Sequence, residues 1–224
     1  MAEALEKSAT MVTATSAFQG VLLEHVSWRT YESLLKDFAD RRWPRFTYDE
    51  GSLEIMTPSH EHDAIGWRLQ KLVETVVEEW ELDLANLGHG TMRRKDMARG
   101  FEADASIYLR HAEAIRGKKE VDLEVDPPPD LVIEVEATRS ALPKLPLYAN
   151  FGVPEVWRWC EGRIIFHVLQ GSSYAESSTS LAFPSITSQL ATELVESAEN
   201  QKAMVWVRSV RKWARENRPR SPMH

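Results

Sequence analysis

The heptapeptide Asp130–Glu136 constrains the fold more than any other part of the chain. It combines four aliphatic residues with three carboxylates, and three prolines directly before it give it a sharp start. Read as a strand, it alternates between two faces, with Leu131, Ile133 and Val135 on one and Val132, Glu134 and Glu136 on the other. Two carboxylates about 7 Å apart on a buried strand require a positive partner. A divalent cation is one solution, and an edge strand with a solvated acidic face is the other.

Composition bounds the class of protein. The 224 residues are 43% apolar and 27% charged, which is typical of a soluble globular domain with one core. A single cysteine, Cys160, argues against disulfides and thiolate metal sites and favours a reducing, cytoplasmic location. No apolar run is long enough to span a membrane, and residues 1–15 lack the features of a secretory signal. A net charge of −7 argues against extensive nonspecific nucleic-acid binding but allows a local basic groove.

The periodicity of the chain predicts one α/β domain over residues 21–196. We expect residues 1–20 to form a flexible tail and residues 197–224 to form an amphipathic helix and tail, the helix packing on the domain rather than contacting nucleic acid. The predicted elements are a helix after the N-cap Ser27, a hairpin of 45–48 and 52–57, a helix over 59–81, strands over 101–109 and 130–136, a helix from Thr138 or Ser140 to Asn150, and a hairpin of 155–159 and 163–169.

Acidic residues recur on the expected inner faces of several elements. Alternation over 101–109 places Asp104 on a face with other polar residues, and Glu61 precedes Ile65 by one helical turn. With Glu134 and Lys144, these residues have the chemistry needed for metal-assisted phosphodiester hydrolysis. For Glu61 the simpler interpretation is stabilisation of the helix dipole. The sequence contains no phosphate-binding P-loop, nucleophile elbow or His-Glu-x-x-His motif.

Four stretches carry a resemblance to a known family. They are residues 51–62, 101–106, 130–135 and 144–157. The order of helix, acidic strand, hairpin partner, acidic strand and helix is similar to the PD-(D/E)XK nuclease core. More closely, residues 27–170 resemble the family of putative restriction endonucleases called Uma-two. This resemblance implies a restriction-endonuclease-like fold, with a central mixed β-sheet flanked by helices.

The resemblance also implies roles for individual residues. Asp104 would be the central ligand of Mg²⁺ (or Mn²⁺), Glu134 the second ligand and the Val135 carbonyl a third, with Glu61 reaching the site from its helix. The superfamily places lysine where this chain has Glu136. Lys144, in the following helix, is the candidate for a relocated catalytic lysine, and the alternative is that it is a surface residue. Ala103 replaces the family's proline before the central aspartate.

Three functions follow from these observations. The first is a divalent-metal-dependent endonuclease acting on DNA through Glu61, Asp104, Glu134, Glu136 and Lys144, which the resemblance implies is a homodimer. The second is a catalytically inactive nucleic-acid-binding or assembly module that retains the nuclease fold. Glu136 in the lysine position and the negative net charge favour it. The third is a hydrolase of a small phosphorylated substrate, which a closed pocket would favour over a groove.

Overall fold

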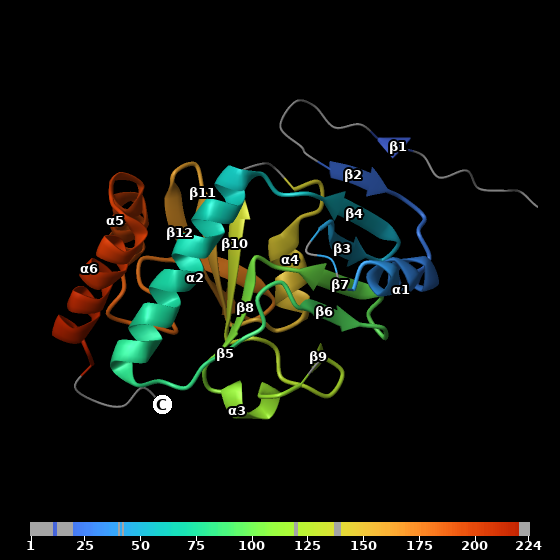
Figure 1. Cartoon of the computed structure of the whole chain (residues 1–224). Coiled ribbons are helices and arrows are strands. Elements are labelled where there is room, and N and C mark those ends of the chain that lie inside the picture. The colour runs from blue at the N-terminus through green and yellow to red at the C-terminus, as the bar shows by residue number, and fades with distance from the viewer. Residues whose placement is uncertain are drawn as a thin grey trace, which may run out of the picture.

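The protein, as a computed structural model, is a mixed α/β molecule whose described strands form two mixed sheets (Figure 1). Residues 11–12, 20–39, 41, 43–118, 121–136 and 140–219 are described. Most of the predicted N-terminal tail therefore lies outside the described residues. One sheet contains, in spatial order, β1 (Met11–Val12), β2 (Gly20–Leu23), β4 (Ser52–Met56), β3 (Arg45–Asp49), β7 (Arg99–Glu102), β6 (Thr91–Arg94) and β9 (Val121–Asp122). The other contains β13 (Ser173–Ser177), β12 (Arg163–Gln170), β11 (Glu155–Cys160), β10 (Leu131–Glu136), β8 (Ala105–Tyr108) and β5 (Ala85–Asn86).

The predicted fold class is confirmed, but the strands are not gathered in one central sheet. The helices are α1 (Trp28–Asp37), α2 (His60–Trp80), α3 (Ala112–Ile115), α4 (Lys144–Asn150), α5 (Ser188–Ser197) and α6 (Ala203–Glu216). Helices α2, α5 and α6 pack together against one face of the second sheet, whereas α4 packs on its other face (Figure 1). Helix α1 packs on β3 and β4 of the first sheet. The second sheet is thus covered on both faces.

Strand β10 lies at the centre of the second sheet, between β8 and a parallel β11. Its two predicted faces are confirmed: Leu131, Ile133 and Val135 pack against the apolar stripe of α2, and Val132 packs in the core on the α4 side. Burial on both faces is usual for a strand with a parallel neighbour. The edge-strand alternative is therefore wrong, and Glu134 is a buried carboxylate.

The predicted single strand over 101–109 is wrong. The chain leaves the first sheet at the end of β7, Glu102, and enters the second sheet at the start of β8, Ala105. Strand β7 pairs with β3 and β6, whereas β8 pairs with β10 and β5. Alternating sequence cannot reveal such a change of partner, because both halves keep the same period. Asp104 therefore lies at the crossing between the two sheets.

The helix after β10 begins later than predicted. Thr138 lies outside the described residues, and Ser140 precedes the helix, its hydroxyl donating to Glu54. Helix α4 begins at Lys144 after the N-cap Pro143. This later start places Pro146 in the first turn, where its missing N–H leaves no helical hydrogen bond unmade.

The C-terminal helix packs on the domain, as predicted. Helix α6 lies along α2, and its buried residues are Trp206, Val207, Val210 and Ala214. Its cationic side chains pair with acids of α2: Arg211 donates to Glu78 at 2.7 Å and Arg215 to Glu79 at 2.7 Å. Among the described residues, no helix has the combined length and hydropathy needed to cross a membrane.

Truncation of Trp206 tests whether α6 is an integral part of the core. Its side chain is fully buried, and its indole N–H donates to the Leu194 carbonyl at 2.7 Å. We expect Trp206→Ala to lower the free energy of unfolding by about 3–5 kcal/mol, because it removes a large core side chain. Met204→Ala, two positions away and 64% exposed, is the matched control and should cost less than about 0.5 kcal/mol. Urea denaturation measures both, and equal small losses would show that α6 is not part of the core.

Candidate active site

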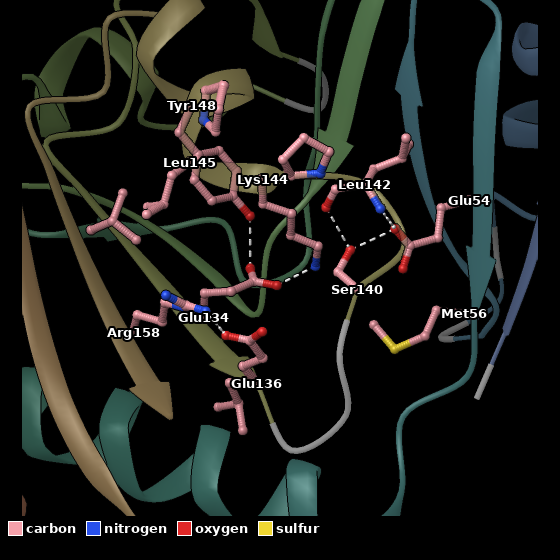
Figure 2. Close-up of a pocket in the computed structure, with 14 residues that line it drawn as sticks. Glu54, Met56, Glu134, Glu136, Ser140, Leu142, Lys144, Leu145, Tyr148 and Arg158 are labelled. Carbon is pink, nitrogen blue, oxygen red and sulfur yellow. Dashed lines mark hydrogen bonds and ion pairs between the residues drawn. The ribbon is translucent and has the colours of Figure 1, made fainter. Parts of the chain in front are cut away.

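A cavity of about 250 Å³ lies between β4, β10 and α4 (Figure 2). Its charged lining residues are Glu54, Glu134, Glu136, Lys144 and Arg158. Apolar side chains complete the wall, namely Met56, Leu142, Pro143, Leu145, Pro146 and Val156. An apolar wall strengthens electrostatic interactions among the few charged groups inside it. The cavity brings together Glu134, Glu136 and Lys144, three of the residues predicted from the sequence.

Glu134 is held by two donors from α4. The Lys144 ammonium forms an ion pair with Glu134 Oε1, and the Tyr148 hydroxyl donates to Glu134 Oε2 at 2.7 Å. Burial raises the pKa of Glu134, and the charge of Asp104 raises it further, although Lys144 opposes the change. Burial alone would lower the pKa of Lys144, but the charges of Glu134, Asp104 and Glu54 outweigh it and leave that pKa raised. Lys144 is therefore a buried cation surrounded by carboxylates, not a surface lysine.

Asp104 is bound by groups from three separate elements. Its Oδ1 accepts from Arg45 of β3, and its Oδ2 accepts from the Val135 N–H of β10 at 2.6 Å. His62 Nε2, on α2, lies 3.3 Å from the same Oδ2. Burial alone would raise the pKa of Asp104, but His62 together with the charges of Arg45 and Lys144 holds it well below its usual range. Asp104 therefore remains ionised, while Glu134 is the more easily protonated of the two carboxylates.

Asp104 and Glu134 line different cavities. Asp104 borders a hollow of about 150 Å³ that also contains Arg45, His62, Gln70 and His89. The Val135 amide links the two sites, because Val135 lines the larger cavity and donates to Asp104. The structure thus brings the Val135 backbone to Asp104 through its N–H, and the metal-binding role of its carbonyl stays a prediction.

Two acids of the larger cavity have different surroundings. Glu136, at the end of β10, forms an ion pair with Arg158 of β11. Glu54, on β4, is only 1% exposed. Its Oε2 accepts from the Ser140 hydroxyl at 2.6 Å and the Leu142 N–H at 3.1 Å, whereas its Oε1 is buried with no hydrogen-bond donor in the described part of the chain.

The predicted inward orientation of Glu61 is wrong. Its side chain is exposed, and His62 is the residue of this turn that is buried and faces Asp104. The Ser59 hydroxyl accepts from the His62 N–H and fixes the start of the helix. Helical spacing from Ile65 predicted that Glu61 faces the sheet, but the buried face at this end of the helix is at His62, one residue later. Glu61 remains in a position to stabilise the helix dipole.

The larger cavity offers carboxylate oxygens, the kind of ligand that a hard divalent cation binds, from Glu54, Glu134 and Glu136. Mg²⁺ and Mn²⁺ prefer carboxylate oxygens, and Glu54 Oε1 is a buried acceptor to which no described residue donates. Within the described ranges, no three acidic, histidine or cysteine side chains are placed to bind one ion together. Lys144 and Arg45 instead supply the positive charge. A cation would therefore compete with Lys144 for Glu134.

Sequence patterns missed several residues that complete the site. Arg45, His62 and Tyr148 contact the two central carboxylates, and Glu54 lines the cavity. The sequence did indicate Glu54, because alternation along its strand places Glu54 on the face opposite to the buried Leu53. Arg45 gave no such signal, since it reaches Asp104 from the other sheet.

Comparison with families of known proteins gives a match over most of the chain. Residues 28–198 match Uma2, described as "Putative restriction endonuclease". Comparison with curated proteins gave no match. Among solved structures, the chain is similar to a crystal structure of a putative nuclease belonging to DUF820 from Anabaena variabilis ATCC 29413. The two are 15% identical, with a TM-score of 0.48, and the match covers 72% of this chain and 98% of the other.

The interaction between Arg45 and Asp104 should show a large coupling free energy, because removing one partner leaves the other as an uncompensated buried charge. Arg45→Met leaves a buried, ionised Asp104 without its main counter-ion, and we expect it to cost about 3–5 kcal/mol. Adding Asp104→Asn should recover part of this loss, because asparagine is neutral and still accepts from the Val135 N–H. Urea denaturation of the two single variants and the double variant gives the coupling free energy.

The exposed pair Arg94–Asp96 is the matched control. Arg94→Met should cost less than about 1 kcal/mol. Additive losses in the Arg45 and Asp104 cycle would contradict a direct charge interaction between these two side chains.

Proposed function

Since the chain belongs to the Uma2 family of putative restriction endonucleases, we propose that it is a divalent-metal-dependent endonuclease that hydrolyses DNA phosphodiester bonds. The observation that carries this proposal is the arrangement of two buried carboxylates, Asp104 and Glu134, on either side of a backbone amide, with Lys144, whose side chain is 10% exposed, beside them. Buried charges of this kind are costly for stability, and sites that retain them are candidates for chemistry.

Asp104, from the smaller hollow, and the residues of the larger cavity would have separate roles in phosphodiester hydrolysis. A bound Mg²⁺ or Mn²⁺ ion, held by Asp104, Glu134 and the Val135 carbonyl, supplies Lewis-acid activation of phosphate and water. Tyr148 fixes the orientation of Glu134 through a bond of 2.7 Å. Lys144 places an ammonium where negative charge develops on the phosphate, which is the usual role of a preorganised cation. Glu136 keeps Arg158 at the cavity wall, where it can bind a phosphate oxygen.

A larger hollow offers a surface for the DNA backbone. It has a volume of about 810 Å³, and its lining includes four cationic side chains, Lys36, Arg41, Arg93 and Lys118. It shares His89 with the hollow that contains Asp104. The lining also includes Glu32 and Glu102, and Lys118 pairs with Asp126, so the hollow has a modest excess of positive charge. Such a local excess is compatible with a negative net charge, because phosphate contacts depend on nearby charge. We further propose that the protein acts as a homodimer, since a duplex presents two strands to be cut.

A second function is favoured by the ion pairs of the site. Arg45 and Lys144 already neutralise Asp104 and Glu134, and Glu136 occupies the usual position of the lysine. These features also suit a catalytically inactive module that binds nucleic acid and keeps the fold. Such a module would bind DNA without any requirement for Mg²⁺ and without cleaving it.

Cation binding and cleavage should be lost together when the central aspartate is changed. We expect Asp104→Asn to weaken Mg²⁺ and Mn²⁺ binding in calorimetry and to slow cleavage of single- or double-stranded DNA by at least about 100-fold. Lys144→Met should lower kcat by about 10²–10³-fold, because it removes a cation that stabilises the transition state. Glu61→Gln, which changes an exposed acid, is the matched control. Cleavage that survives Asp104→Asn would refute the assignment, and cation binding without cleavage of any DNA would favour a small phosphorylated substrate.

Charge reversal should show whether the basic hollow contacts DNA. The double variant Lys36→Glu/Arg41→Glu should weaken duplex binding at low salt by about 10-fold or more. It should also reduce the slope of log K against log salt by about 2, since each phosphate contact contributes about 0.9. Arg208→Glu, on the exposed part of α6, is the control. Fluorescence anisotropy measures duplex binding by both variants. An equal loss of binding in Lys36→Glu/Arg41→Glu and in Arg208→Glu would contradict a dedicated DNA surface.

A further inference from the structure

We propose that Glu54 of β4 is an additional carboxylate ligand of the divalent cation, and that the cation and Lys144 are alternative counter-ions of Glu54 and Glu134. This inference rests on the proposed function, because it concerns the same cavity. Glu54 lies on a different sheet from Glu134, and the two face one cavity from opposite walls (Figure 2).

The two oxygens of Glu54 have unequal surroundings. Oε2 is satisfied by the Ser140 hydroxyl and the Leu142 N–H, which tie β4 to the segment before α4. Oε1 is buried and accepts no hydrogen bond from any described residue, and the whole side chain is only 1% exposed. A buried carboxylate oxygen without a partner costs free energy comparable to a lost hydrogen bond. An ion bound in the cavity would remove that cost.

The charges around the cavity also favour the binding of a cation. Asp104 is neutralised by Arg45, and Glu136 is paired with Arg158. Of the remaining described cations that line the cavity, Lys144 pairs with Glu134, and its ammonium lies between Glu134 and Glu54 (Figure 2). With both carboxylates ionised, these described side chains carry a net charge of −1 in a mostly apolar cavity. A divalent cation would balance the two carboxylates completely.

This exchange has a consequence for Lys144. In the structure its ammonium is bound to Glu134 and therefore directed at the protein's own carboxylate. A cation that takes over Glu54 and Glu134 frees the ammonium for an anionic ligand such as a phosphate group. Cation binding would thus prepare the site for substrate before any substrate arrives.

The substitution Glu54→Gln separates this role from a structural one. The amide oxygen can still accept from Ser140 and Leu142, so the link between β4 and the segment before α4 is retained. The negative charge and the free carboxylate oxygen are lost. Glu24→Gln is the matched control. Glu24 accepts at 2.7 Å from the hydroxyl of Ser52, the first residue of β4, and it does not line the cavity.

Calorimetric titration of Mn²⁺ into the full chain, without DNA, is the test. We expect Glu54→Gln to weaken Mn²⁺ binding by at least about 10-fold, and Glu24→Gln to leave it unchanged. Lys144→Met should bind Mn²⁺ at least several-fold more tightly than wild type, because the competing ammonium is gone. This second variant also tests the inference if Glu54→Gln does not fold.

The outcomes distinguish this inference from the proposed function. Wild-type binding that is lost in Asp104→Asn but unchanged in Glu54→Gln would overturn the role of Glu54 and leave the metal site in place. Unchanged or weaker Mn²⁺ binding by Lys144→Met would overturn the exchange of counter-ions. The absence of any Mn²⁺ binding by wild type would overturn both the metal dependence of the proposed function and this inference.

Discussion

The need to balance two buried carboxylates determines how the elements of this protein meet. Asp104 and Glu134 are almost inaccessible to water, and an ionised carboxylate in such a place requires partners. Those partners come from β3, α2 and α4, which are distant in the sequence. The approach of the two sheets, the position of the start of α2 and the packing of α4 therefore all converge on one pair of charges.

The sequence predicted the parts of this arrangement that depend on local periodicity. The two faces of β10, the long α2, both hairpins and the packing of α6 follow from alternation or helical spacing, and each is present. Sequence reasoning failed where an element changes partner or where two elements meet. The crossing at Asp104 interrupts a continuous alternating pattern, and the contact between Arg45 and Asp104 joins two sheets. At the start of α2, the one-residue difference between Glu61 and His62 depends on docking, not on spacing.

Many cationic side chains in the basic stretches of this acidic chain pair with acids of the same molecule. The basic residues at the turn between β6 and β7 pair with nearby acids, Arg94 with Asp96 and Arg99 with Asp49. The arginines of α6 pair with the acidic end of α2. Much of the positive charge that the sequence displays in clusters is thus used within the molecule, where each exposed pair contributes little to stability.

The place of Asp104 at the crossing between the sheets has a consequence for how related chains should be interpreted. Its carboxylate joins Arg45 of one sheet to the Val135 amide of the other, so it connects the two layers whatever chemistry occurs beside it. A chain that had lost all cleavage would still need an acid at this point to keep its architecture. An aspartate at this place is therefore explained by folding alone, and under the proposed function the cavity acids and Lys144 would be the residues whose loss separates an inactive chain from an active one.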